Sequence, residues 1–160
     1  MYCAGLVGSR GSGSLTTGFG LLSQPFEACK RFSRLRTLVM HGSGGGKLLL
    51  WHGFNDPGPS PLSTIAYYEA VQKAVPAARG STRLFLAPGV LHCGGGSGPD
   101  RFDTLTALEN WVERGVPPAS MLATKQGSPL SRPLCPYPAL PRYKGTGDPN
   151  DAASFACAAD

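Results

Sequence analysis

The sequence is poor in charge, in cysteine pairs and in long apolar runs. Charged side chains make up only 16% of its 160 residues, which is low for a free-standing globular domain. No apolar run approaches the roughly 20 residues of a membrane span, and the N-terminus lacks the pattern of a secretory signal peptide. The five cysteines are too few for a small disulfide scaffold and form no CxxC pair. We therefore expect no membrane segment and no structural zinc.

The net charge of +5 does not predict a nucleic-acid partner. Residues 1–43 carry five basic and one acidic side chain, whereas residues 44–160 carry ten basic and nine acidic ones. The basic excess therefore belongs to the N-terminal segment, which lacks the interleaved aromatic residues of a nucleic-acid-binding surface.

Two segments are predicted to have little regular structure. Glycine and proline are abundant, at 22 and 15 residues, and residues 1–44 are punctuated by Gly and Ser throughout. These residues are interpreted as a poorly ordered extension, with "RTLVM" as the one strand-like piece. The Pro-rich segment after Gly115 is likewise expected to be largely irregular. Residues 45–160 form the second unit of the chain.

This second unit begins with alternating strands and helices. "KLLLWHG" and "STRLFLAP" are typical of buried parallel strands. Ser63 is expected to cap the helix between them, and Asp100 to precede a second helix that ends at Gly115. The apolar faces comprise Ile65, Tyr68, Val71 and Val75 in the first helix and Leu105, Leu108, Trp111 and Val112 in the second. The order predicts the α/β class, with a right-handed βαβ unit in a doubly wound sheet.

An acid and a histidine follow the two predicted strands. Asp56 comes shortly after the first and His92 shortly after the second. Catalytic groups of open α/β sheets collect beyond the carboxyl ends of the strands, and an Asp held against a His prepares the ring as a general base. The alternative is an Asp that caps a turn and an unrelated surface His, and the pattern alone favours neither interpretation.

The nucleophile of such an acid–base pair is missing. No G-x-S-x-G motif occurs, although Asp followed by His is the order found in α/β-hydrolases. Ser43 precedes the first strand and would lie about 16 Å from Asp56 along it. Ser97 has no strand-to-helix elbow behind it. We therefore expect a chain with two members of a triad.

The loop "GVLHCGGGSGPD" is a weak candidate for binding a metal or a phosphate. Adjacent His92 and Cys93 rarely point at one ion, and no second ligand pair lies nearby. Glycines 94–96 lack the Lys-Ser/Thr that follows a phosphate loop. We expect them to let the backbone pass tightly beside the site.

Two further groups favour structural roles. Trp51 and His52 end the first strand, where buried packing is the common role. Asp148 and Asp151 lack the full ligand spacing of a calcium loop, which favours a capped turn.

The sequence resembles the tannase and feruloyl esterase family of α/β-hydrolases. The resemblance is carried from about Gly45 to Cys157 by "GGKLLLWHGFNDP", "TIAYYEAV", "RLFLAPGVLHCGGGSGPDRFDTLTALENWVERG", "RPLCPYP" and "YKGTGDPNDAASFAC". It implies a secreted or periplasmic serine esterase that cleaves phenolic-acid esters such as gallates, feruloyl esters and chlorogenate, and in some members a terephthalate monoester.

The resemblance also implies roles for individual residues. Asp56 matches the triad acid and His92 the triad base. Cys93 matches a cysteine that ties the histidine loop to the serine loop, and Cys135 and Cys157 match a pair that forms a disulfide. A 22-residue separation gives such a bridge about 3 kcal/mol in the chain-entropy model.

The serine motif, the first strands and a large lid domain lie upstream in the family, and residues 1–44 match none of them. The sequence is therefore interpreted as a partial α/β-hydrolase fold, the C-terminal part of a longer enzyme with an unrelated start. Cys93 is expected to lack its native partner; Cys3 or Cys29 could pair with it, but nothing in the spacing supports that. No cofactor is expected in this chain, and the family's calcium would belong to the lid. The rival hypothesis is a non-catalytic fragment or interaction module. The oligomeric state is left open.

Overall fold

The described part of the computed structural model, residues 4–7 and 46–159, contains the predicted order of strands and helices. The first elements are β1 (Ala4–Val7), β2 (Lys47–Gly53), α2 (Pro61–Ala74), the 3-10 helix η2 (Pro76–Gly80), β3 (Thr82–Ala87) and α3 (Thr104–Arg114). They are followed by β4 (Met121–Thr124), β5 (Ser131–Leu134), β6 (Leu140–Tyr143), the 3-10 helix η3 (Ala152–Ser154) and β7 (Phe155–Ala158). None of the described helices is long and apolar enough to cross a bilayer.

The main sheet has the strand order β1-β2-β3. β2 and β3 are parallel, with Leu50 opposite Leu84, as the two apolar runs predict. β1 pairs antiparallel with β2. This strand was not expected, because residues 1–44 were interpreted as a poorly ordered extension, and four residues are too few to show periodicity. The "RTLVM" cluster lies outside the described residues.

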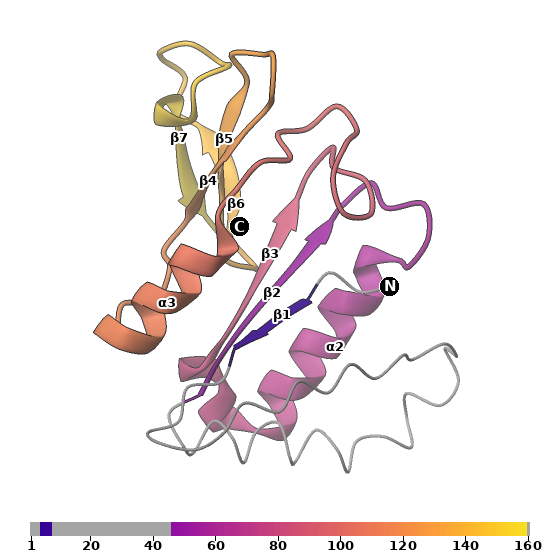
Figure 1. Cartoon of the computed structure of the whole chain (residues 1–160), viewed down its shortest axis with the longest axis vertical. Coiled ribbons are helices and arrows are strands. Elements are labelled where there is room, and N and C mark those ends of the chain that lie inside the picture. The colour runs from indigo at the N-terminus through magenta and orange to yellow at the C-terminus, as the bar shows by residue number, and fades with distance from the viewer. Residues whose placement is uncertain (1–3, 8–45, 160) are drawn as a thin grey trace.

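Strand alternation sends successive side chains of the sheet to opposite faces. Leu49 and Phe85 belong to the core cluster that packs against α3, whereas Leu84 and Leu86 belong to the cluster that packs against α2. The two helices accordingly lie on opposite sides of the sheet (Figure 1). Because both faces of the sheet are covered, β2 and β3 are apolar along nearly their whole length.

Helix α2 begins earlier than predicted. Its N-cap is Ser60, whose hydroxyl accepts from Leu62 N, so the assignment of the cap to Ser63 was wrong. Pro61 occupies the first turn, where a missing N–H costs nothing and the fixed φ suits the helix. Tyr68 and Val71 are buried as expected.

Helix α3 is capped at both ends by its own sequence. Asp103 accepts from Thr106 N at 2.9 Å, and Gly115 ends the helix with φ at +69°. Leu108 and Trp111 are buried, but Leu105 is 56% exposed and does not belong to the buried face. The predicted face was therefore one residue too wide.

The Pro-rich segment is more regular than predicted. β4 pairs antiparallel with β5, and β6 with β7, giving two hairpins near one end of the sheet (Figure 1). Met121, Ala123 and Leu134 of the β4–β5 hairpin belong to the core cluster on the α3 side of the sheet. Tyr137, between the two hairpins, makes a further connection to the βαβ unit. Its backbone N donates to Leu84 O in β3 at 2.7 Å, and its hydroxyl donates to Glu69 in α2 at 2.5 Å.

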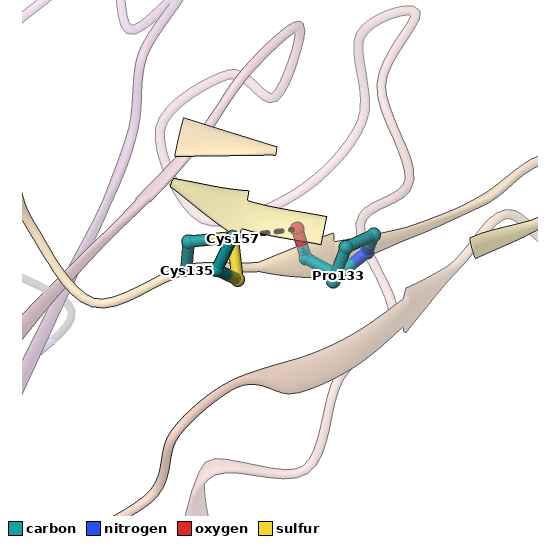
Figure 2. The surroundings of a disulfide bond; sticks show 3 residues. All are labelled: Pro133, Cys135 and Cys157. Carbon is teal, nitrogen blue, oxygen red and sulfur yellow. Dashed lines mark hydrogen bonds between the residues drawn. A yellow bond between two sulfur atoms is a disulfide. The ribbon is translucent and has the colours of Figure 1, made fainter. Parts of the chain in front are cut away.

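A disulfide links the two hairpins. Cys135, just after β5, is bonded to Cys157 in β7, with 5.5 Å between their Cα atoms. Figure 2 shows this bond and the Pro133 carbonyl oxygen, 3.8 Å from the Cys135 sulfur. Strands β6 and β7 contain no fully buried residue. The disulfide therefore provides an attachment to β5 that side-chain burial in these two strands does not.

Candidate active site

The candidate site lies where β2 and β3 end. Gly53 is opposite Ala87 in the parallel register, so the two following loops leave the same edge of the sheet. Phe54 N donates to Ala87 O at 2.9 Å, and Asn55 N donates to Val90 O at 3.0 Å. The main chain therefore fixes how the two loops sit against each other.

Glycines allow this close approach. A Cβ on Gly53 would lie 1.9 Å from the Leu91 carbonyl oxygen, and a Cβ on Gly96 would lie 2.2 Å from the Gly89 carbonyl oxygen. The tight passage expected of glycines 94–96 is thus made by Gly96. Sequence reasoning missed Gly53, although a glycine at the end of a buried strand is a signal for such an approach.

Asp56 and His92 meet across the two loops. Asp56 Oδ2 lies 2.6 Å from His92 Nδ1. The Asp56 side chain is 1% exposed and that of His92 is 36% exposed. A carboxylate only accepts hydrogen bonds, so Nδ1 carries the shared proton and Nε2 is left as the basic nitrogen. Among the described residues, no serine or threonine hydroxyl is hydrogen-bonded to the His92 ring.

The environment of Asp56 keeps its carboxyl ionised. Burial by itself raises the pKa of this group, but hydrogen bonds from His92, Gly58 N and His52 to the charged form outweigh burial, and the pKa falls below its ordinary value. Gly58 N donates to Oδ1 at 2.8 Å. A charged carboxylate at this place can orient an imidazole and stabilise its protonated form.

His52 is a site residue that sequence reasoning assigned to packing. It is buried as expected, at 7% exposure, but its Nε2 also lies 3.1 Å from Asp56 Oδ2. Its position four residues before the acid, at the end of the same strand, was the available signal. Trp51, the adjacent residue, points to the opposite face and packs edge-on against Phe102 with ring centroids 4.9 Å apart.

Asp100 and Lys125 hold the glycine-rich part of the histidine loop. Asp100 Oδ2 accepts from Gly95 N at 2.6 Å, and Lys125 Nζ lies 3.4 Å from Asp100 Oδ1 while donating to Gly96 O at 2.9 Å. The Gly95 hydrogen bond is the main cause that lowers the pKa of Asp100. Asp100 was expected near the start of α3, but Asp103 caps that helix.

A cavity of about 350 Å³ opens beside the histidine loop. It is lined by Trp51, Cys93, Asp100, Arg101, Phe102 and Thr104. Cys93 is disulfide-bonded in the structure and is therefore not a free thiol.

The remaining candidates have structural positions or lie outside the described residues. Asp148 accepts from Asn150 N at 2.8 Å and Asp151 caps η3, as expected of capped turns. Among residues 4–7 and 46–159, no three His, Cys, Asp or Glu side chains gather so as to hold a metal ion. Ser97 approaches Gly89, and Ser43 is outside the described part.

The sequence matches a known family. The sequence model of "Tannase and feruloyl esterase" matches residues 36–158. The chain belongs to this family. All candidate site residues and both cysteines of the Cys135–Cys157 bridge fall inside the match.

Individual relatives show how much of an enzyme the chain represents. It is 52% identical over 122 residues to the mono(2-hydroxyethyl) terephthalate hydrolase of Piscinibacter sakaiensis, covering 72% of this chain and 20% of that protein. It is 46% identical over 128 residues to a probable feruloyl esterase of Arthroderma benhamiae, covering 72% of this chain and 23% of that protein. The chain therefore spans about a fifth to a quarter of the length of these relatives.

The fold is similar to solved structures of the same family. The structure of feruloyl esterase B from Aspergillus oryzae superposes with a TM-score of 0.67 at 28% identity, covering 76% of this chain and 28% of that one. The chain thus shares part of the fold of these α/β-hydrolases, and its relatives are ester hydrolases by name.

Proposed function

We propose that this chain carries the acid–base half of a serine-type carboxylic ester hydrolase that acts on esters of phenolic acids. The observation that carries the proposal is the 2.6 Å contact between the buried Asp56 carboxylate and Nδ1 of the partly exposed His92. It has the geometry that a general base needs, because Nδ1 is held by the carboxylate and the side chain is 36% exposed.

The proposed reaction uses His92 first as a base and then as an acid in each of its two halves. Its Nε2 takes the proton of a serine hydroxyl contributed from outside the described residues while that oxygen attacks the ester carbonyl. The same nitrogen then protonates the leaving alcohol oxygen as the tetrahedral intermediate collapses to an acyl-enzyme. In the second half of the reaction His92 takes a proton from a water molecule as the water oxygen attacks the acyl carbon. It gives that proton to the serine oxygen as the bond between that oxygen and the acyl carbon breaks and the free acid leaves. Asp56 holds the ring and stabilises the imidazolium at each stage.

The proposed setting is secreted or periplasmic. Disulfides persist in oxidising compartments, and the Cys135–Cys157 bond supports this assignment. The proposed partner is a small phenolic ester, with no nucleic acid and no membrane.

The test uses the relative with 52% identity as a host. Residues 36–158 of this chain replace the matching segment of the terephthalate monoester hydrolase, and hydrolysis of that monoester and of methyl ferulate is measured. We expect the chimera to be active, Asp56→Asn to lose about 10⁴-fold in kcat and His92→Gln at least as much. Glu113→Gln, an exposed carboxylate-to-amide change in α3, is the matched control and should leave the rate unchanged.

Two outcomes would contradict the proposal. One is a His92→Gln chimera that keeps its rate, because then this ring is not the base. The other is steady ester hydrolysis by the 160-residue chain alone, which we expect to be inactive, since its described residues offer His92 no hydroxyl nucleophile. An inactive but folded chimera would favour the non-catalytic module.

A further inference from the structure

The buried ring of His52 makes polar contacts through both of its nitrogens. Nδ1 lies 2.7 Å from Thr64 Oγ1 in the first turn of α2. Nε2 lies 3.1 Å from Asp56 Oδ2 and 3.1 Å from the Pro59 carbonyl oxygen. The ring therefore bridges the start of α2 to the carboxylate that contacts His92.

The identity of these partners determines where the protons are. Both atoms near Nε2, the Asp56 carboxylate oxygen and the Pro59 carbonyl oxygen, can only accept hydrogen bonds, so Nε2 must carry a proton. In the neutral ring Nδ1 then has a lone pair, which can accept from the Thr64 hydroxyl. A hydroxyl is the one partner in this set that can act as donor. The Thr64 hydroxyl can therefore donate to Nδ1 in the same tautomer that the two acceptors at Nε2 require.

The fold explains why these three side chains meet. His52 follows Trp51 on β2, and alternation turns it toward the face covered by α2. Ser60 and Pro61 start α2 so that Thr64 falls in its first turn, beside the end of β2. The beginning of the helix is therefore part of the construction of the site.

We propose that His52 is a positioning residue for Asp56, and that the Thr64 hydroxyl fixes the His52 tautomer that donates to the carboxylate. The triad role of Asp56 rests on the proposed function, but the hydrogen-bond relay Thr64–His52–Asp56–His92 does not. His52 Nε2–H and His92 Nδ1–H share Oδ2, while Gly58 N holds Oδ1. These bonds prevent rotation of the carboxylate away from His92.

The first arm of the test reads the tautomer directly in the whole, unchanged chain. Two-bond ¹H–¹⁵N correlation spectra of the labelled chain at pH 7 report which His52 nitrogens are protonated. We expect a protonated Nε2 and an unprotonated Nδ1. An unprotonated Nε2 would overturn the proposal, and a doubly protonated ring would overturn the role of the Thr64 hydroxyl as donor.

The second arm compares matched variants in the same chain. His52→Leu removes the donor, whereas His52→Gln can present an amide N–H at about the reach of Nε2. We expect the carboxyl ¹³C titration midpoint of Asp56 to rise in the Leu variant and to return toward the original value in the Gln variant. An unchanged midpoint in a folded Leu variant would reduce His52 to a packing residue and overturn the proposal.

Thr64 provides the arm that survives if His52→Leu does not fold. Thr64→Val keeps the volume but loses the hydroxyl, and Thr64→Ser keeps the hydroxyl. We expect the ¹⁵N resonance of His52 Nδ1 to move in the Val variant and to be restored in the Ser variant. No movement would overturn the proposed role of Thr64. Every arm measures protonation or hydrogen bonding by NMR and none measures turnover. An inactive chimera would therefore contradict the proposed function without contradicting the hydrogen-bond relay.

Discussion

The βαβα unit and the β6–β7 hairpin are stabilised in different ways. Strands β2 and β3 are buried on both faces, and their two clusters contain fully buried side chains such as Phe85 and Leu84. The hairpin β6–β7 has no fully buried residue and depends on the Cys135–Cys157 bond. Burial therefore positions the site residues, and it also anchors the β4–β5 hairpin, whose Met121, Ala123 and Leu134 belong to the α3-side core cluster. Covalent and hydrogen-bonded links attach the β6–β7 hairpin.

The contrast extends to the site itself. Asp56 and His92 follow the buried strands, so their placement is inherited from the core. Lys125, just after β4, is the hairpin residue that reaches the histidine loop, through Gly96 O and Asp100. Damage to the core should thus move the whole site, and damage to the hairpins should loosen one side of it.

The largest effect is expected from Trp111→Ala in α3. Trp111 is 2% exposed in the core cluster that covers one face of the sheet, and removing it should lower the free energy of unfolding by about 3–5 kcal/mol. Urea denaturation followed by circular dichroism measures the change. Leu105→Ala is the control on the same helix, and its 56% exposure predicts a change within about 0.5 kcal/mol. Equal losses in the two variants would contradict the assigned buried face.

The next effect is expected from removing the disulfide. Cys135→Ser combined with Cys157→Ser opens a loop of 22 residues and should cost about 3 kcal/mol in the chain-entropy model. Hydrogen exchange should show loss of protection in β6 and β7, while the amides of β3 keep theirs. Uniform loss across both regions would show that the hairpins and the core unfold as one unit.

The core of the fold was predictable because its signals are local. The two apolar runs identified β2 and β3, and the residues just after them placed Asp56 and His92 at one edge of the sheet. His52 was missed because a histidine at the end of a strand looks the same in the sequence whether it only packs in the core or also contacts the site. The hydrogen bond to Asp56 in the structure distinguishes these two roles.

The β6–β7 hairpin was not predictable from its own residues. β6 carries no alternation of buried and exposed side chains, and its partner β7 is brought to it by backbone pairing and the bond to Cys135. The start of α2 was also predicted wrongly, because local sequence offers more than one cap. Ser63 and Ser60 are both capable caps, and Pro61 at the first turn decides between them.

A smaller effect is expected from acid, through the clamp on the histidine loop. The pKa of Asp100 is below its ordinary value of 3.8, chiefly because of the Gly95 hydrogen bond. A depressed carboxyl pKa stabilises the fold above the ordinary value, and this contribution is lost as the pH falls through the folded-state pKa. Asp100→Asn should therefore flatten the fall in stability below pH 3.8. An unchanged acid limb, measured by urea denaturation at stepped pH, would contradict the clamp.

The smallest effect concerns the join between the hairpins and the core. Tyr137→Phe removes the hydroxyl that donates to Glu69, and an exposed hydrogen bond of this kind is worth about 0.5 kcal/mol. The same bond raises the pKa of Tyr137, so its contribution is present below the ordinary tyrosine pKa and is lost as the pH rises through the folded-state value. A double-mutant cycle with Glu69→Gln measures the coupling. Zero coupling would assign the join to the backbone bond from Tyr137 N to Leu84 O and to the Tyr68–Tyr137 ring contact.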